Sequence, residues 1–130
     1  MLAQARLSFF IVLAQVCLFL CGGMHTLMIS ANYPEMFNYI GLYSAGVDFT
    51  HIKMEEIKAY ANLDAKLAQS NPKLYWIACG DADRLMPFNK QLMERMDKDG
   101  LKYVFHESSR GHLWSNWRQY SLLFIPQLFK

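Results

Sequence analysis

Two acidic residues and a histidine stand at spacings that could support proton transfer. Asp81 and Asp83 directly follow an apolar segment, residues 73–80, and His112 comes 29 positions (112 minus 83) after Asp83. A carboxylate can hold an imidazole in one tautomer and stabilise its cation, while the imidazole takes a proton from a nucleophile and returns it to a leaving group. An acid followed by a histidine is also the order in which a serine, acid, histidine triad continues after its nucleophile.

Each of these residues has a structural explanation as well. Acidic residues after a strand commonly cap the next helix, and a histidine in a glycine-containing loop is often a turn residue. Spacing alone leaves both interpretations open.

The elements that would position these residues alternate along the chain. Apolar residues at helical spacing predict helices within residues 22–34, 53–69, 87–100 and 114–126. Apolar and aromatic runs predict strands over residues 37–46, 73–80 and 101–107. This alternation predicts an α/β fold with a mostly parallel sheet flanked by helices, whose reactive groups lie in loops at the carboxyl ends of the strands.

Composition limits the classes of protein to consider. With 130 residues, of which 53% are hydrophobic, the chain can form one domain or part of one. Its net charge of +2 comes without a basic run, which argues against a nucleic-acid partner. Cys17, Cys21 and Cys79 lack CxxC spacing, so neither a disulfide framework nor a zinc site is expected.

The first 21 residues have the character of an apolar leader. Arg6 precedes an apolar run from Leu7 to Cys21, as in a signal peptide, but Gln15 interrupts it and no AxA-like cleavage site follows. The run of about 14 residues is shorter than the ~20 that span a bilayer, so a buried strand or helix is an alternative. A membrane partner is expected only if this leader is real.

Beyond the leader, Gly80 to Asp83 fits the motif GxxD, and Gly111, His112 and Trp117 fit GGHxxxxW with Arg110 in place of the first glycine. With these motifs, residues 22–130 resemble an esterase family of α/β-hydrolases in which GxxD holds the acid and GGHxxxxW the histidine. The family includes feruloyl and acetyl xylan esterases, enterochelin esterase and formylglutathione hydrolase. The resemblance implies the C-terminal part of an α/β-hydrolase fold, with Asp83 as the acid, Asp81 as its neighbour and His112 as the base.

The same resemblance also suggests what the whole enzyme does. It implies a serine-type hydrolase of acylated plant polysaccharide, with feruloyl or acetyl esters, or of a small-molecule ester. It implies no cofactor or metal, and a secreted or periplasmic location. The oligomeric state stays open.

The nucleophile turn is where the sequence departs from the family. The family has GLSMGG where this chain has LFLCGG, so Leu20 stands at the serine position, Leu18 at the first glycine, and Cys21 where a backbone amide would bind the oxyanion. Leucine has no hydroxyl, and no acyl intermediate can form there. Cys21 is a poor substitute nucleophile because Phe19 would crowd the tight turn. We therefore expect a truncated, inactive chain.

That expectation gives the domain organisation as well. Residues 22–130 form a partial esterase domain, and residues 1–21 are a signal peptide, a remnant strand or a segment read in a shifted frame. The alternatives to an enzyme are a non-catalytic carbohydrate-binding or exported protein that keeps the fold, or a gene fragment.

Two further residue groups could bind ligands. Trp114 and Trp117 have flat apolar faces that suit a sugar or an aromatic acyl group, although core packing is an equal alternative. Cys21 and His25 have helical spacing, but no second ligand pair accompanies them, which favours local packing over metal binding.

Overall fold

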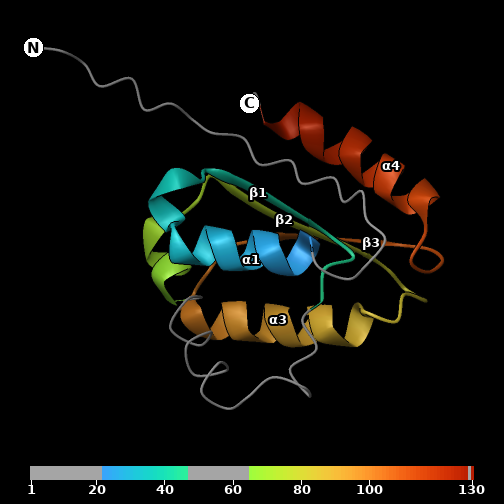
Figure 1. The fold of residues 1–130 in the computed structure, drawn as a ribbon, viewed down its shortest axis with the longest axis horizontal. Coiled ribbons are helices and arrows are strands. Elements are labelled where there is room, and N and C mark those ends of the chain that lie inside the picture. The colour runs from blue at the N-terminus through green and yellow to red at the C-terminus, as the bar shows by residue number, and fades with distance from the viewer. Residues whose placement is uncertain (1–21, 47–64, 129) are drawn as a thin grey trace, which may run out of the picture.

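The computed structural model describes residues 22–46, 65–128 and 130, which form a three-layer arrangement of helix, sheet and helix (Figure 1). The elements are α1 (Gly22–Asn32), β1 (Tyr39–Tyr43), β2 (Leu74–Gly80), α3 (Met86–Asp99), β3 (Val104–Ser108) and α4 (Trp114–Phe124), with short 3-10 helices at Pro34–Met36 and Ile125–Gln127. Residues 65–70 are helical too, as predicted, whereas residues 53–64 of that predicted helix lie outside the described part. The predicted alternation of elements and the α/β fold class are confirmed.

The three strands form one parallel sheet in the order β1-β2-β3. In β1 and β2 the register pairs Tyr43 with Ala78, and in β2 and β3 it pairs Gly80 with Ser108. The carboxyl ends of all three strands therefore meet at one edge of the sheet, which is the edge that holds functional groups in folds of this kind.

β2 is the central strand and is buried on both faces. Successive side chains of a strand point to opposite faces, so Tyr75 and Ile77 lie in one core while Trp76 and Ala78 lie in the other. This double burial explains why the sequence of β2 is continuously apolar instead of alternating.

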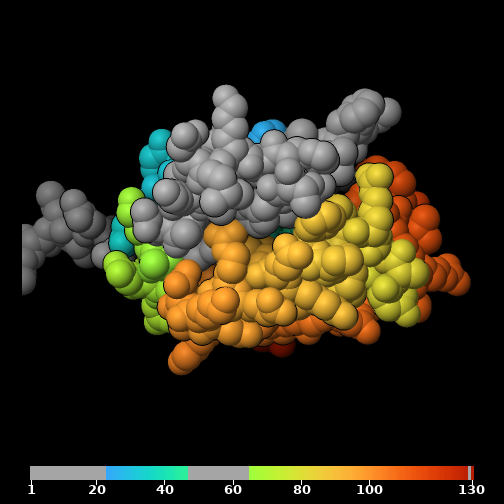
Figure 2. Space-filling model, turned by 90° about the horizontal axis from the view of Figure 1, so that it is seen from below, coloured from blue at the N-terminus to red at the C-terminus, as the bar shows by residue number. Residues whose placement is uncertain are grey.

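The larger core lies between the sheet and the layer of α1 and α3. Leu27 of α1, Ile40 of β1, Ile77 of β2, and Leu92 and Met96 of α3 pack together there, each at most 2% exposed. Figure 2 shows part of this side of the molecule formed by the outer surface of α3, in yellow and orange.

The opposite face of the sheet packs against α4 through aromatic side chains. Tyr43 meets Trp76 and Phe124 edge-on, with ring centroids 5.5 Å and 6.2 Å apart. A Cβ on Gly41 would lie 3.0 Å from the ring of Phe124, so this position in β1 has little room for a side chain. The aromatic pairs add to the stability that burial alone gives.

The ends of α3 lie within one residue of the predicted range, 87–100. Pro87 stands in its first turn, and Gly100 caps it in the left-handed conformation (φ 74°) that glycine adopts freely. The amide of Leu101 still bonds to the carbonyl of Met96, because the helix cap extends that far. The prediction that the last strand starts at Leu101 was therefore wrong, and β3 starts at Val104.

The inner face of α3 includes one polar residue. Asn89 is fully buried there beside Leu92 and Met96, and its Nδ2 donates to the carbonyl of Leu85 (2.9 Å) and to Sγ of Cys79 (3.4 Å).

Among the residues that the structure describes, none of the helices has the length and apolar character needed to cross a membrane. The apolar leader, residues 1–21, lies outside those residues.

Replacing Leu92 with alanine tests the position of the larger core. Leu92 is 2% exposed, so Leu92→Ala should lower the free energy of unfolding by about 2–5 kcal/mol. Leu122→Ala is the matched control, because Leu122 on α4 is 76% exposed and its loss should change the stability by less than about 0.5 kcal/mol. Urea unfolding followed by circular dichroism measures both, and similar losses in the two variants would contradict the described core.

Candidate active site

Asp83 and His112 meet at the carboxyl edge of the sheet. Asp83 lies in the turn after β2 and His112 in the loop after β3. Nδ1 of His112 is 3.0 Å from Oδ2 of Asp83 and 3.3 Å from Oδ1. The carboxylate is 0% exposed and the imidazole 32% exposed. The structure thus brings a buried carboxylate and a partly exposed imidazole into hydrogen-bonding contact.

The backbone around Asp83 fixes the carboxylate. Oδ1 accepts a hydrogen bond from the amide of Leu85 (2.9 Å), and the carbonyl of Asp83 accepts one from the amide of Met86 (2.9 Å). The amide of Asp83 in turn donates to the carbonyl of Gly80 (3.1 Å). The Asp83 carboxylate therefore binds both the backbone at the start of α3 and the imidazole of His112.

Asp81 is placed differently. Its side chain is exposed, and its amide donates to the carbonyl of Ser108 (2.7 Å) at the end of β3. The next amide, that of Ala82, donates to the carbonyl of Arg110 (3.2 Å). Through these two bonds the turn that carries the acid is joined directly to the loop that carries the histidine.

Gly80 is necessary for this close approach. A Cβ at position 80 would lie 2.1 Å from the carbonyl oxygen of Arg110, a distance that real Cβ atoms do not reach. Arg110 itself has φ 74°, a left-handed conformation that costs a residue with a side chain roughly 1–2 kcal/mol. The resembling family has glycine at this position, and Arg110 keeps the left-handed backbone conformation that glycine favours.

Asn116 also shapes the histidine loop, and the sequence analysis missed it. It is 5% exposed on the inner face of α4, where its Nδ2 donates to the carbonyls of Ser109 (3.0 Å) and Gly111 (3.1 Å). Its spacing of four from Tyr120, which in turn lies four before Phe124, places a polar residue on an apolar helix face. A polar residue at this spacing was the feature of the sequence that could have indicated that Asn116 binds the histidine loop.

The two tryptophans of α4 have different surroundings. The ring of Trp117 stands at 85° to the imidazole of His112, with centroids 4.8 Å apart, and its Nε1 donates to Oγ of Ser44 (3.2 Å). Trp114 is 52% exposed and meets Trp117 edge-on at 5.1 Å. Of the two, Trp114 has the face that is open to a ligand.

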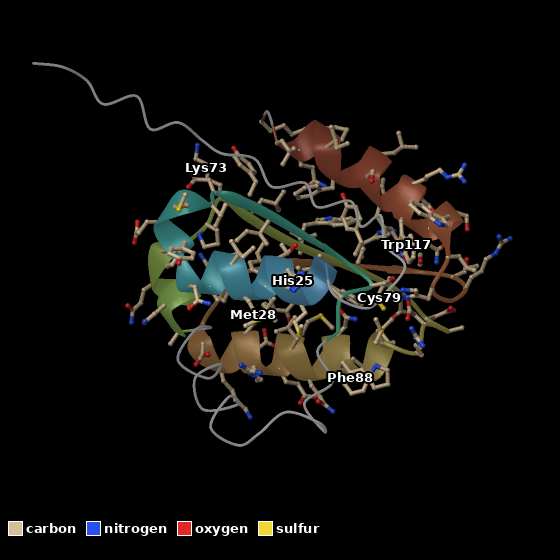
Figure 3. The ribbon with its side chains drawn as sticks, in the orientation of Figure 1. His25, Met28, Lys73, Cys79, Phe88 and Trp117 are labelled. Carbon is tan, nitrogen blue, oxygen red and sulfur yellow. The ribbon has the colours of Figure 1, made fainter. Side chains whose placement is uncertain are left out.

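Cys79 lies beside the site but is unsuited to nucleophilic attack. Burial, and after it the negative charge of Asp83, raises the pKa of its thiol to about 12. The free thiol is buried at the end of β2, so it stays protonated at neutral pH. Figure 3 shows Cys79 and Trp117 at the side of the molecule where the strands end, with Lys73 at the opposite side.

The predicted nucleophile position lies outside the described residues. This holds for Leu18, Leu20 and Cys21, which directly precede α1. A Cβ on Gly23 would lie 2.1 Å from Cβ of Ala45, so the start of α1 lies against the loop after β1. His25 is exposed on α1 (Figure 3), and the described residues contain no group of three or more His, Cys, Asp or Glu that could hold a metal ion.

A parallel sheet between helical layers, with an acid after one strand and a histidine after the next, is the arrangement of the C-terminal part of an α/β-hydrolase. Solved structures confirm this class of fold. A ferulic acid esterase superposes with a TM-score of 0.67 at 16% sequence identity, covering 82% of this chain. S-formylglutathione hydrolase from Staphylococcus aureus superposes with a TM-score of 0.65 at 17% identity, covering 84% of this chain. The resemblance seen in the sequence is thus confirmed in the fold.

Sequence similarity is narrower. No protein-family model matches the chain. An acetyl esterase from Caldicellulosiruptor saccharolyticus is 37% identical over 51 residues, which are 39% of this chain and 19% of that protein. The chain likewise spans about half of the two solved esterases, 47% and 48% of their lengths.

Substitutions at Gly80 and Arg110 should have opposite effects on stability. Gly80→Ala should lower the free energy of unfolding by about 1–3 kcal/mol, because the added methyl group overlaps the Arg110 carbonyl. Arg110→Gly should raise it by about 0.5–1 kcal/mol, because relief of the left-handed backbone exceeds the extra entropy of the unfolded chain. Urea unfolding of both variants measures this, and stabilisation by Gly80→Ala would refute the described contact between the loops.

Proposed function

We propose that this chain carries the acid and histidine of a carboxylic-ester hydrolase, with Asp83 as the orienting acid and His112 as the general base and acid. The observation that carries this proposal is the hydrogen-bonded pair of Asp83 and His112 at the carboxyl edge of an α/β-hydrolase sheet. The named activities of the structural neighbours, both ester or thioester hydrolases, support it.

The geometry of the pair suits proton transfer. The buried carboxylate accepts the Nδ1 proton, which selects the tautomer whose Nε2 is free to take a proton from a nucleophile. The imidazole is 32% exposed, so a nucleophile and a leaving group can reach it. As the imidazolium forms, the Asp83 carboxylate stabilises its charge. The side chains perform the proton transfer themselves, and we propose no cofactor or metal.

The nucleophile of such a site belongs at position 20. In this sequence that position is Leu20, and the backbone amide of Cys21 would serve the oxyanion. The order of the chain supports this, because these residues lead into α1, whose start lies against the loop after β1. A leucine forms no acyl intermediate, so we propose that the sequence as given lacks the serine and is inactive towards esters.

The proposed substrate class is an acetyl or feruloyl ester of plant polysaccharide. It is supported by the named activities of an acetyl esterase and a ferulic acid esterase among the similar proteins. The exposed ring of Trp114, next to Trp117 and the histidine loop, offers a flat apolar face for an aromatic acyl group or a sugar.

The tautomer of His112 tests the role of the acid. Nitrogen-15 NMR of the neutral imidazole should show the proton on Nδ1, because the buried carboxylate accepts it. Asp83→Asn should shift the population towards the other tautomer, while Asp81→Asn, at an exposed position, is the matched control and should leave it unchanged. An Nε2-protonated ring in the unchanged chain would rule out the proposed roles.

Ester turnover tests the nucleophile position. Hydrolysis of 4-nitrophenyl acetate by the chain should not exceed the rate with His112→Ala, because no serine stands at position 20. His25→Ala, which removes an exposed histidine on α1, controls for hydrolysis by surface imidazoles. Turnover that is lost in His112→Ala but kept in His25→Ala would contradict the proposed inactivity of the chain towards esters.

A further inference from the structure

The imidazole of His112 needs more than one contact to hold its orientation. Its loop is largely exposed, and the hydrogen bond to Asp83 fixes only the Nδ1 edge of the ring. The ring can still tilt about that bond, and tilting would move Nε2 away from a nucleophile. The described contact that restrains the tilt is the ring of Trp117, which stands at 85° to the imidazole with centroids 4.8 Å apart.

Trp117 is itself anchored to a distant part of the chain. Its Nε1 donates to Oγ of Ser44 (3.2 Å), and the two residues are 73 positions apart. Trp117 is only partly buried and packs beside the fully buried Tyr120 and Phe124, which already hold α4 against the sheet. The packing of α4 against the sheet therefore does not need the bond to Ser44, and the effect of that bond is to fix the orientation of the indole.

Ser44 is a rigid anchor point. It is 3% exposed, and its amide donates to the carbonyl of Ala78 (2.7 Å). A hydrogen bond from its side chain lowers the pKa of the Cys79 thiol, against the larger effect of burial. Its φ of 48° is left-handed, a conformation in which glycine would avoid strain. A serine at this position supplies what glycine cannot, namely the hydroxyl that receives the indole N–H.

We infer that Ser44 and Trp117 are positioning residues for His112, with Ser44 acting through the indole of Trp117. This inference rests on the proposed function of the Asp83 and His112 pair and adds two residues to it, one directly after β1 and one from α4. Neither residue transfers a proton. Their effect is to hold the imidazole plane so that Nε2 faces the position of the nucleophile.

Exchange of the His112 Nδ1 proton with water measures how firmly the ring is held. Ser44→Ala should speed this exchange roughly fivefold, the scale expected for one lost hydrogen bond. Trp117→Phe keeps a ring beside the imidazole but removes the indole N–H, so it should have a similar effect. The double variant should exchange no faster than Trp117→Phe alone, because both changes break the same bond.

A variant that removes the Ser44 hydroxyl without lowering stability distinguishes positioning of His112 from a purely structural role. Ser44→Gly relieves the left-handed backbone and removes the hydroxyl, so it should be at least as stable as Ser44→Ala and yet show the same faster exchange. Ser30→Ala is the matched control, because Ser30 is a 2% exposed serine of α1 whose hydroxyl donates to the carbonyl of Leu27. It should leave the exchange unchanged.

The inference is overturned if Ser44→Gly exchanges at the rate of the unchanged chain, or if the effects of Ser44→Ala and Trp117→Phe add. The tautomer experiment on His112 tests the proposed function independently of this positioning role. An effect of Asp83→Asn without an effect of the Ser44 variants would remove the positioning role alone, whereas an Nε2-protonated ring would remove the proposed function itself.

Discussion

A fully buried carboxylate is the constraint on which the site depends. Asp83 is 0% exposed, and a charge removed from water is costly unless hydrogen bonds and a partner replace the water. The amide of Leu85 and the imidazole of His112 supply these partners, and they come from the start of α3 and from the loop after β3. The need to satisfy one side chain therefore couples two segments of the chain, and displacing either segment would remove one of the two partners of the carboxylate.

The parallel sheet brings the two loops into reach. Because Gly80 is paired with Ser108 in the register of β2 and β3, the turn with the acid and the loop with the histidine start side by side. Two backbone bonds, from Asp81 and Ala82, then join them before any side chain takes part. The absence of a side chain at Gly80 permits this contact. Sheet register, a glycine and backbone bonding thus set the distance from carboxylate to imidazole.

The sequence predicted the parts of this arrangement that depend on local patterns. The continuous apolar run of β2, the proline and glycine at the ends of α3, and the order of acid and histidine could all be read from neighbouring residues. Ser44 and Asn116 could not be assigned their roles, because these depend on contacts between segments far apart in the chain. The start of β3 was misplaced because the cap of α3 takes up residues that have the composition of a strand.

Backbone strain marks the same edge of the sheet. Among the described residues, Ser44, Asn71 and Arg110 have positive φ and a side chain. Asparagine tolerates this conformation, and Asn71 lies before β2, away from the site. The other two have no such tolerance, and they lie where β1 ends and where the histidine loop begins. Strain of this kind persists only where surrounding contacts hold it. Here the Ser44 hydroxyl accepts a hydrogen bond from the indole of Trp117, which contacts the imidazole, and the Arg110 carbonyl accepts one from the amide of Ala82, which joins the histidine loop to the turn that carries Asp83.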